Sequence, residues 1–174
     1  EGLQAQVPAL VNGSMSGIGY LGSDIGGFCN SKYEGDDLYL RWVQLGVFYP
    51  VMRTHAQESL NPEPYNRPGI LDKVRDAINL RYAYLPYSYT RAYLNTRYGS
   101  PMARPANFAD EDKSVLANCK DAYLWGPDIY VAPVVTGNTS RNITFPEGDW
   151  LDMNDFSTIY SGHQTVYNYS APLE

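Results

Sequence analysis

The stretch that most constrains this sequence is residues 17–28, GIGYLGSDIGGF, in which an apolar run leads to an acid followed by two glycines. Ile18, Tyr20 and Leu21 suit a buried strand. The glycines let the backbone turn tightly or come close to a ligand. The pattern therefore predicts a strand that ends at Asp24. The carboxyl ends of strands carry the chemistry of barrels and open α/β sheets, so Asp24 is either a site residue or a cap of the following turn or helix.

A second segment of the same kind follows. Residues 47–55, VFYPVMRTH, are apolar and end in Arg53 and His55, which predicts another short strand with polar groups at its end. A helix is expected between the strands, over residues 37–46. Its apolar face carries Leu38, Trp42 and Leu45. Because strand and helix alternate, two neighbouring strands would bring Asp24 and His55 to the same end of one sheet.

The remaining sequence predicts two more helices and a β-rich end. Residues 1–11 have helical spacing, and a long amphipathic helix begins at Ile70, is kinked by Pro86 and ends at Gly99. From about residue 113 the sequence changes to short apolar runs separated by turn residues, which is typical of strands and hairpins. We therefore expect two domains, residues 1–112 and residues 113–174.

Charge and composition limit the partners. The net charge is −6 at pH 7 and the basic residues do not cluster, which argues against nucleic acid and anionic membrane surfaces. No apolar run reaches the roughly 20 residues of a membrane helix. The 16 tyrosines, 3 tryptophans and 5 phenylalanines exceed what burial usually requires, and rings with a polar tip suit walls that stack on sugars or bases. A neutral ligand is therefore expected.

Neither a cofactor nor a metal is indicated. Cys29 and Cys119 are far apart in the sequence, so two buried free thiols are expected instead of a zinc site or a disulfide. A phosphate site near Asp24 would lack the G-x-G-x-x-G spacing and the P-loop lysine. A metal site could use Asp24 and His55, but no third ligand is evident. A sugar site fits best, with these two residues bonding hydroxyls and Phe28 forming an apolar wall.

The order of several motifs resembles glycoside hydrolase family 31. The α-glucosidases of that family carry G-x-D-I-G-G-F at a strand end, followed by R-W-x-Q-x-G-x-F-x-P-x-x-R-x-H. Both motifs occur here, in residues 22–28 and 41–55. Further matches lie in residues 81–89, 99–105, 131–134 and 146–152. Matches in this order over most of the chain make the resemblance specific.

The resemblance implies an α/β fold that corresponds to the last part of a (β/α)8 TIM barrel, followed by the start of an all-β sandwich. Strands seven and eight of the barrel are expected in this chain. A complete barrel typically takes about 250 residues, so we expect a longer polypeptide or a second chain that completes it. Alone, this part would expose strand edges and an apolar face.

The resemblance also assigns site residues. Asp24, Phe28 and His55 match family positions that line the subsite for the non-reducing terminal sugar, where Asp24 and His55 would bond its hydroxyls. Arg53 matches a neighbouring position that is assigned to structural support. The tyrosine-rich segment 81–89 is assigned to the core.

The implied function is that of a retaining α-glycosidase that hydrolyses terminal α-linked glucosyl residues of oligosaccharides without a cofactor. Retention needs two carboxylates about 5 Å apart. In the family these lie on strand four and just before the position where this chain begins, so no catalytic residue is expected here and the chain alone is expected to be inactive. Asp24 matches the binding acid, not the nucleophile. A transglucosidase, an α-xylosidase or a non-catalytic carbohydrate-binding fragment remain alternatives.

Overall fold

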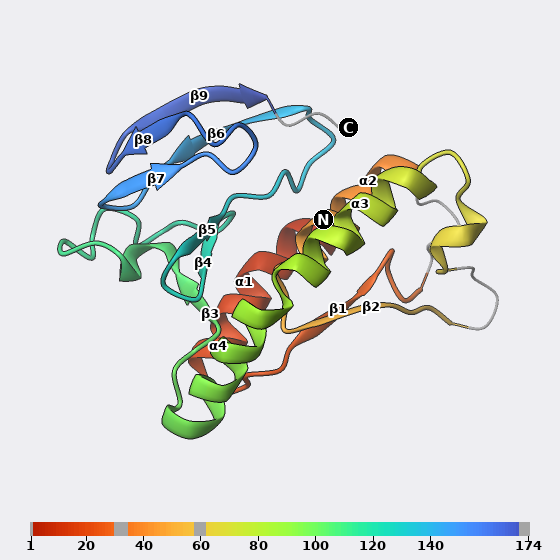
Figure 1. Cartoon of the computed structure of the whole chain (residues 1–174), viewed down its shortest axis with the longest axis horizontal. Helices are drawn as coiled ribbons and strands as arrows, with labels where there is room; N and C mark the ends of the chain where they lie inside the picture. Colours follow the sequence, from red (N-terminus) through yellow and green to blue (C-terminus); the bar gives the residue numbers. More distant parts are fainter. Residues whose placement is uncertain (1, 30–34, 58–61, 171–174) are drawn as a thin grey trace.

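The computed structural model describes residues 2–29, 35–57 and 62–170. Helices dominate its first part, short strands make up its last part, and a two-stranded parallel sheet, β1 (Gly22–Ile25) with β2 (Val51–Thr54), lies at the lower right in the view of Figure 1. The helices are α1 (Gly2–Met15), α2 (Asp36–Gly46), α3 (Leu71–Ala83) and α4 (Leu85–Tyr98), with short 3-10 helices η2 (Pro64–Asn66) and η3 (Ala106–Phe108). The other strands are β3 (Ala103–Pro105), β4 (Tyr123–Trp125), β5 (Ile129–Val131), β6 (Ser140–Thr144), β7 (Asp149–Leu151), β8 (Ile159–Ser161) and β9 (Thr165–Ser170).

The parallel pair β1 and β2 is the part of the fold that matters most for the site. Asp24 lies opposite Arg53 in this pair, so the prediction that both strands end on the same side is confirmed. Because side chains alternate along a strand, the two faces of the pair differ. One face packs on α2, where a β-carbon at Gly46 would lie only 2.8 Å from Cδ1 of the buried Ile25. The other face carries Asp24, Arg53 and the 39% exposed Val51, and it is open.

Helix α2 confirms the predicted helix and supplies much of the core. Two acids in its first turn complement the helix dipole. Its most buried apolar side chains are Tyr39, Leu40, Trp42, Val43 and Leu45. Leu38 is 42% exposed, so its assignment to the apolar face is wrong. Burial in α2 begins at Tyr39, and Leu38 lies in the first turn outside this zone.

The strand predicted from residue 17 begins later than expected. β1 starts at Gly22, whereas Ile18 and Tyr20 are 53% and 55% exposed, so a buried strand over these residues is wrong. The Tyr20 hydroxyl instead lies 3.0 Å from Oγ1 of Thr96 on α4. The segment before β1 therefore runs along α4 with its side chains partly in solvent.

The long helix predicted from Ile70 is interrupted. α3 ends and α4 begins around Tyr84, two residues before Pro86, because proline is tolerated in the first turn of a helix but not in its interior. α4 ends at Gly99, as predicted, and Gly99 adopts a left-handed conformation with φ 70°.

The assignment of segment 81–89 to the core is wrong for its exposed residues, among them three large apolar side chains. Tyr82, Leu85 and Tyr89 are 67%, 41% and 79% exposed. Among the residues that the structure describes, no element covers this side of α3 and α4. Helical periodicity identified an apolar face, but that face lacks a packing partner here.

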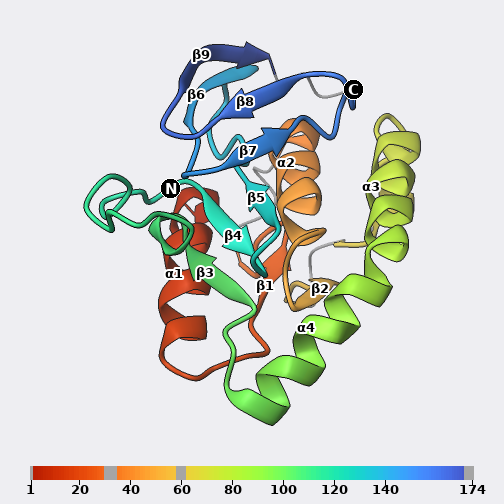
Figure 2. The ribbon, with the colours of Figure 1, turned by 60° about the vertical axis from the view of Figure 1, so that its left-hand side comes forward.

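The β-rich part consists of small antiparallel units. β3, β4 and β5 form one sheet, β6 pairs with β9, and β7 pairs with β8. Figure 2 shows β3 beside α1. Tyr123 and Trp125 of β4 are completely buried in the core that both parts share. The β-rich part therefore packs against the helices through its first sheet.

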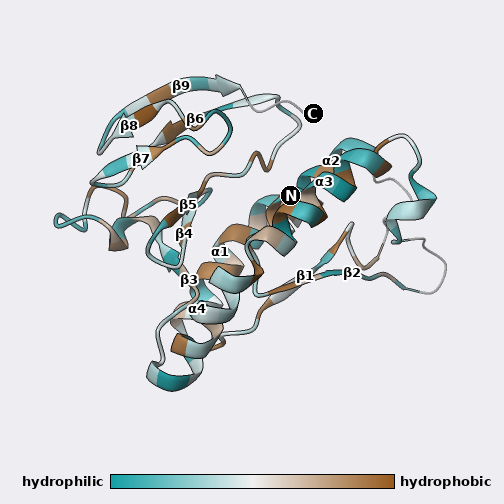
Figure 3. Cartoon of the chain, in the orientation of Figure 1, coloured by the Kyte–Doolittle hydropathy of each residue, from teal (hydrophilic) through white to brown (hydrophobic). Residues whose placement is uncertain are grey.

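Hydrophobic residues, brown in Figure 3, occur in short stretches in both parts of the chain. None of the helices in the described ranges has the length and apolar content to cross a bilayer. Both cysteines are free, but Cys29 is exposed and Cys119 only partly buried, so the predicted burial of both thiols is wrong. Cys29 directly follows the glycine-rich loop, where the chain lies at the surface.

The turn between α2 and β2 is held from two sides. The Arg81 guanidinium on α3 donates to backbone carbonyl groups of residues 47–50, among them those of Val47 (2.7 Å) and Pro50 (3.0 Å). From β4, the Tyr123 hydroxyl donates to the carbonyl of Phe48 (2.8 Å). Burial lowers the pKa of Arg81, which nevertheless keeps its charge because an arginine pKa lies far above neutral pH. The turn that leads into β2 is thus fixed by a helix and by the β-rich part together.

Gly126, between β4 and β5, provides a test of this packing. It has φ +62°, and an added β-carbon would lie 2.2 Å from the Tyr87 hydroxyl. That hydroxyl has two acceptors within reach of its one proton, the carbonyl oxygen of Trp125 and Oδ2 of Asp128, both at 3.0 Å. Burial together with Asp128 raises the pKa of Tyr87 to about 12. We expect Gly126→Ala to cost about 1–3 kcal/mol locally.

Hydrogen exchange of the β4–β5 hairpin, measured by mass spectrometry, should therefore speed up in Gly126→Ala. Gly137→Ala is the matched control, because nothing lies within 4 Å of its added β-carbon and its φ is ordinary. Equal exchange in both variants would contradict the close packing of Tyr87 on the hairpin.

Candidate functional site

An ion pair joins the ends of β1 and β2. The Arg53 side chain donates to Oδ1 of Asp24 from Nε (3.0 Å) and from Nη2 (2.8 Å). The pair follows from the strand register, which sets the two residues opposite each other on the open face. The Asp24 side chain is 24% exposed and that of Arg53 is 58% exposed. The carboxylate is therefore partly shielded and held from one side.

The two other predicted site residues lie against each other just past the strands. The rings of Phe28 and His55 have centroids 5.5 Å apart and are tilted by 35°. The Gln57 amide donates to the carbonyl of Phe28 (2.9 Å), which keeps the two chain segments side by side beyond the end of the sheet. Phe28 is 48% exposed, so its ring presents an apolar surface to solvent.

The loop that carries Asp24 is supported from the helix side. Gly26 and Gly27 have φ of +95° and +84°, which other residues rarely adopt, and the Gly27 amide donates to the carbonyl of Asp24 (2.9 Å). The indole Nε1 of Trp42 donates to Oγ of Ser23 (2.8 Å). This support leaves the loop little freedom next to the carboxylate.

The arrangement can bind hydroxyl groups beside an apolar wall. A carboxylate accepts hydrogen bonds, an imidazole both donates and accepts them, and a phenyl ring covers the apolar face of a ligand. Within the described ranges, no three His, Cys, Asp or Glu side chains are placed to hold a metal ion. The charged group in contact with Asp24 is the Arg53 cation, not a second carboxylate.

The sequence predicts Asp24, Phe28 and His55 at one end of a sheet, and in the structure they lie at or just past the ends of β1 and β2. It did not reveal that Arg53 bonds Asp24 directly, nor that Trp42 supports Ser23. The spacing could have indicated the contact between Arg53 and Asp24. Arg53 stands two residues before His55, so both side chains point to the same side of the extended chain, where Asp24 was also expected.

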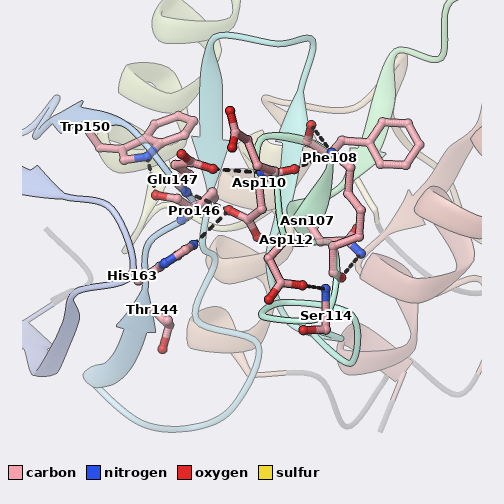
Figure 4. A network of polar contacts seen from close by, with 12 residues as sticks. Asn107, Phe108, Asp110, Asp112, Ser114, Thr144, Pro146, Glu147, Trp150 and His163 are labelled. Carbon is pink, nitrogen blue, oxygen red and sulfur yellow. Dashed lines mark hydrogen bonds and ion pairs between the residues drawn. The ribbon is translucent and has the colours of Figure 1, made fainter.

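A concave region lies apart from these residues, in the β-rich part, next to the polar contacts drawn in Figure 4. It is lined by Glu111, Asp112, Glu147, Gly148, Asp149, Gly162 and His163. The buried Asp110, next to Glu111 in the sequence, accepts a hydrogen bond at Oδ1 from the Glu147 amide (2.6 Å), and Oδ1 lies 3.4 Å from Nε2 of His163. These contacts tie the segment after η3 to the loop before β7 and to the turn between β8 and β9. They account for Oδ1 of Asp110 as a structural clamp, whereas the buried Oδ2 has no hydrogen-bond partner among the described residues.

Two family models match the chain. The model of the glycosyl hydrolases family 31 TIM-barrel domain matches residues 1–91, and that of the glycosyl hydrolase family 31 C-terminal domain matches residues 99–174. The expected fold class, the C-terminal part of a TIM barrel followed by a β-rich domain, is confirmed. The boundary between residues 112 and 113 remains our proposal.

Individual proteins support the same relationship. An α-glucosidase of Saccharolobus solfataricus is 30% identical over 94% of this chain and 25% of its own length. An α-xylosidase of Arabidopsis thaliana is 33% identical over 99% of this chain and 19% of its own. A solved structure, a family 31 dextranase variant of Flavobacterium johnsoniae complexed with isomaltotriose, superposes with a TM-score of 0.87 at 30% identity, over 98% of this chain and 22% of its own.

The chain spans a quarter or less of the length of the curated relatives that it matches first. These relatives therefore bear on the fold of the whole described region, while their activities belong to much longer proteins.

The clamp formed by Asp110 leads to a prediction. Asp110→Ala leaves the Glu147 amide without its charged acceptor, so we expect the exchange of that amide to rise at least about tenfold, because a hydrogen bond to a charged group contributes roughly 1.5–3 kcal/mol. Hydrogen exchange resolved to residues 145–149 is the measurement. Asp76→Ala, an exposed acid on α3, is the control. Unchanged exchange at Glu147 would show that the clamp does not hold this loop.

Proposed function

This chain belongs to glycoside hydrolase family 31, and we propose that the whole protein is a retaining α-glycosidase that removes terminal α-linked glucosyl residues from oligosaccharides. In this proposal the chain contributes one wall of the subsite for the non-reducing terminal sugar. The observation that carries it is the grouping of Asp24, Phe28 and His55 at the open end of β1 and β2.

Each of the three side chains has a role in this proposal. Asp24 accepts hydrogen bonds from sugar hydroxyls, and His55 forms another hydrogen bond to the same sugar. Phe28, whose ring lies against that of His55, packs against the apolar face of the sugar ring. A pair of hydroxyl-binding groups beside an aromatic wall is what a neutral sugar requires.

The bond-breaking groups are proposed to lie outside this chain. A retaining mechanism uses a nucleophile and an acid/base about 5 Å apart, and both are carboxylates. Asp24 is paired with Arg53, which suits a binding role and not half of such a carboxylate pair. We therefore propose that this chain alone does not hydrolyse glycosides.

The names of the relatives support a glycosidase and differ in the sugar. One is an α-glucosidase, one an α-xylosidase and one a dextranase. We favour a glucosyl substrate, because the residues 22–28 and 47–55 match the α-glucosidase pattern. Rates on nitrophenyl α-glucoside and nitrophenyl α-xyloside separate the two sugars in the whole protein.

Asp24→Ala in the whole protein tests the binding role. We expect kcat/KM to fall by at least about 100-fold, ~3 kcal/mol, because hydrogen bonds to sugar hydroxyls strengthen in the transition state. The melting temperature should stay nearly unchanged, since Asp24 is partly exposed. Asp76→Ala is again the control, and kinetics of Asp24→Ala close to those of the unmodified protein would defeat the assignment.

Product analysis with maltose distinguishes hydrolysis from transfer. Both reactions pass through the same covalent glycosyl-enzyme intermediate and differ in the acceptor that reaches it. Glucose alone indicates hydrolysis, whereas longer oligosaccharides indicate a transglucosidase. Binding of maltose without any turnover, measured by titration calorimetry, would instead indicate a carbohydrate-binding protein.

A further inference from the structure

The Arg53–Asp24 contact is one-sided. Both donors of the guanidinium, Nε and Nη2, reach the same carboxylate oxygen, Oδ1. Among the residues that the structure describes, Oδ2 of Asp24 has no hydrogen-bond partner. One oxygen is therefore held by the protein, and the other is left without a protein donor on the face of β1 and β2 that carries both side chains.

The contact constrains the direction of the carboxylate. An Asp side chain in a strand has several staggered positions, and its terminal torsion is broad. The planar guanidinium of an arginine fixes an acceptor in direction as well as distance. Arg53 itself lies on β2, which is paired with β1, so the position of the carboxylate depends on the backbone of β2.

A contribution to folding stability explains the Arg53–Asp24 contact less well than a role in orienting the carboxylate. The Arg53 side chain is 58% exposed, and ion pairs that reach solvent contribute little to folding. The ion pair between Arg75 and Asp72 on α3 has the same arginine exposure, 58%, and lies on a surface without the site residues. The Arg75–Asp72 pair therefore serves as a reference for the effect on stability and activity of an exposed ion pair that orients no site residue.

The position of His55 adds to the argument. It stands two residues after Arg53, on the same side of the chain that leaves β2, and its ring contacts Phe28. The β2 end thus carries both the group that orients Asp24 and a second sugar-binding side chain. Any shift of β2 moves both together.

We propose that Arg53 is a positioning residue, which holds Oδ1 of Asp24 so that Oδ2 is presented to a hydroxyl of the terminal sugar. This inference rests on the proposed function, and it replaces the general structural role that the sequence suggested for Arg53. The guanidinium does not touch the sugar; it acts through Asp24.

The test is a double-mutant cycle in the whole protein, assayed with nitrophenyl α-glucoside. The variants are Arg53→Gln, Arg53→Lys, Asp24→Ala and the combination of Arg53→Gln with Asp24→Ala, with Arg75→Gln as the matched control. We expect Arg53→Gln to lower kcat/KM by about 10- to 100-fold, mostly through kcat, because misplacing a group by about 1 Å costs this much. Arg53→Lys should recover part of the loss with its single ammonium group.

The combined variant decides the question. If Arg53 acts through Asp24, Arg53→Gln changes kcat/KM less than about twofold in the Asp24→Ala background, since neighbours in one network are not additive. A full additional loss there would mean that Arg53 contacts the sugar itself, and it would overturn the proposal. Loss of activity together with a lower melting temperature in Arg53→Gln, unlike Arg75→Gln, would overturn it in favour of a folding role.

A crystal structure of Arg53→Gln gives a readout that does not depend on a measurable rate. We expect an intact β1–β2 pair with the Asp24 carboxylate rotated or in two positions. A carboxylate that stays in place would overturn the inference while leaving the proposed function untouched. Absence of glycosidase activity in the unmodified protein would instead overturn both.

Discussion

The parallel pairing of β1 with β2 is the constraint on which the rest of the site depends. Its register sets Asp24 opposite Arg53 and turns both toward the open face, while Ile25 faces α2. A slip of one residue would exchange the two faces and bury the carboxylate against the helices. The short segment that follows keeps the same order, since the Gln57 amide bonds the carbonyl of Phe28. A backbone pattern thus decides which side chains can meet a ligand.

Much of the fold could be predicted because its signals are local. The α2 helix, the end of α4 at Gly99 and the common end of the two strands follow from periodicity, turn chemistry and the alternation of strand and helix. Burial was less predictable. Tyr82 and Tyr89 have the spacing of a core face, yet they are exposed, because periodicity defines a face and not the element that covers it.

The residues of the candidate site were predicted from the sequence, but the contacts that hold them in place were not. Motifs identified Asp24, Phe28 and His55, but the bond from Arg53 to Oδ1 of Asp24 depends on the register between two strands that are distant in sequence. The support of Ser23 by Trp42 depends likewise on how α2 packs. Such contacts depend on the tertiary structure. A sequence pattern can indicate them only where the spacing places two residues on a face that is already known.

The turn between α2 and β2 has a consequence for recombination between homologues. Arg81 binds its carbonyl groups from α3, and Tyr123 binds the carbonyl of Phe48 from the β-rich part. The strand that bears Arg53 and leads to His55 is therefore braced by Tyr123, which lies in the β-rich part. A crossover placed between the helices and the β-rich part would combine Tyr123 from one parent with the turn between α2 and β2 from the other. We therefore expect such a crossover to be tolerated only where both parents keep these contacts.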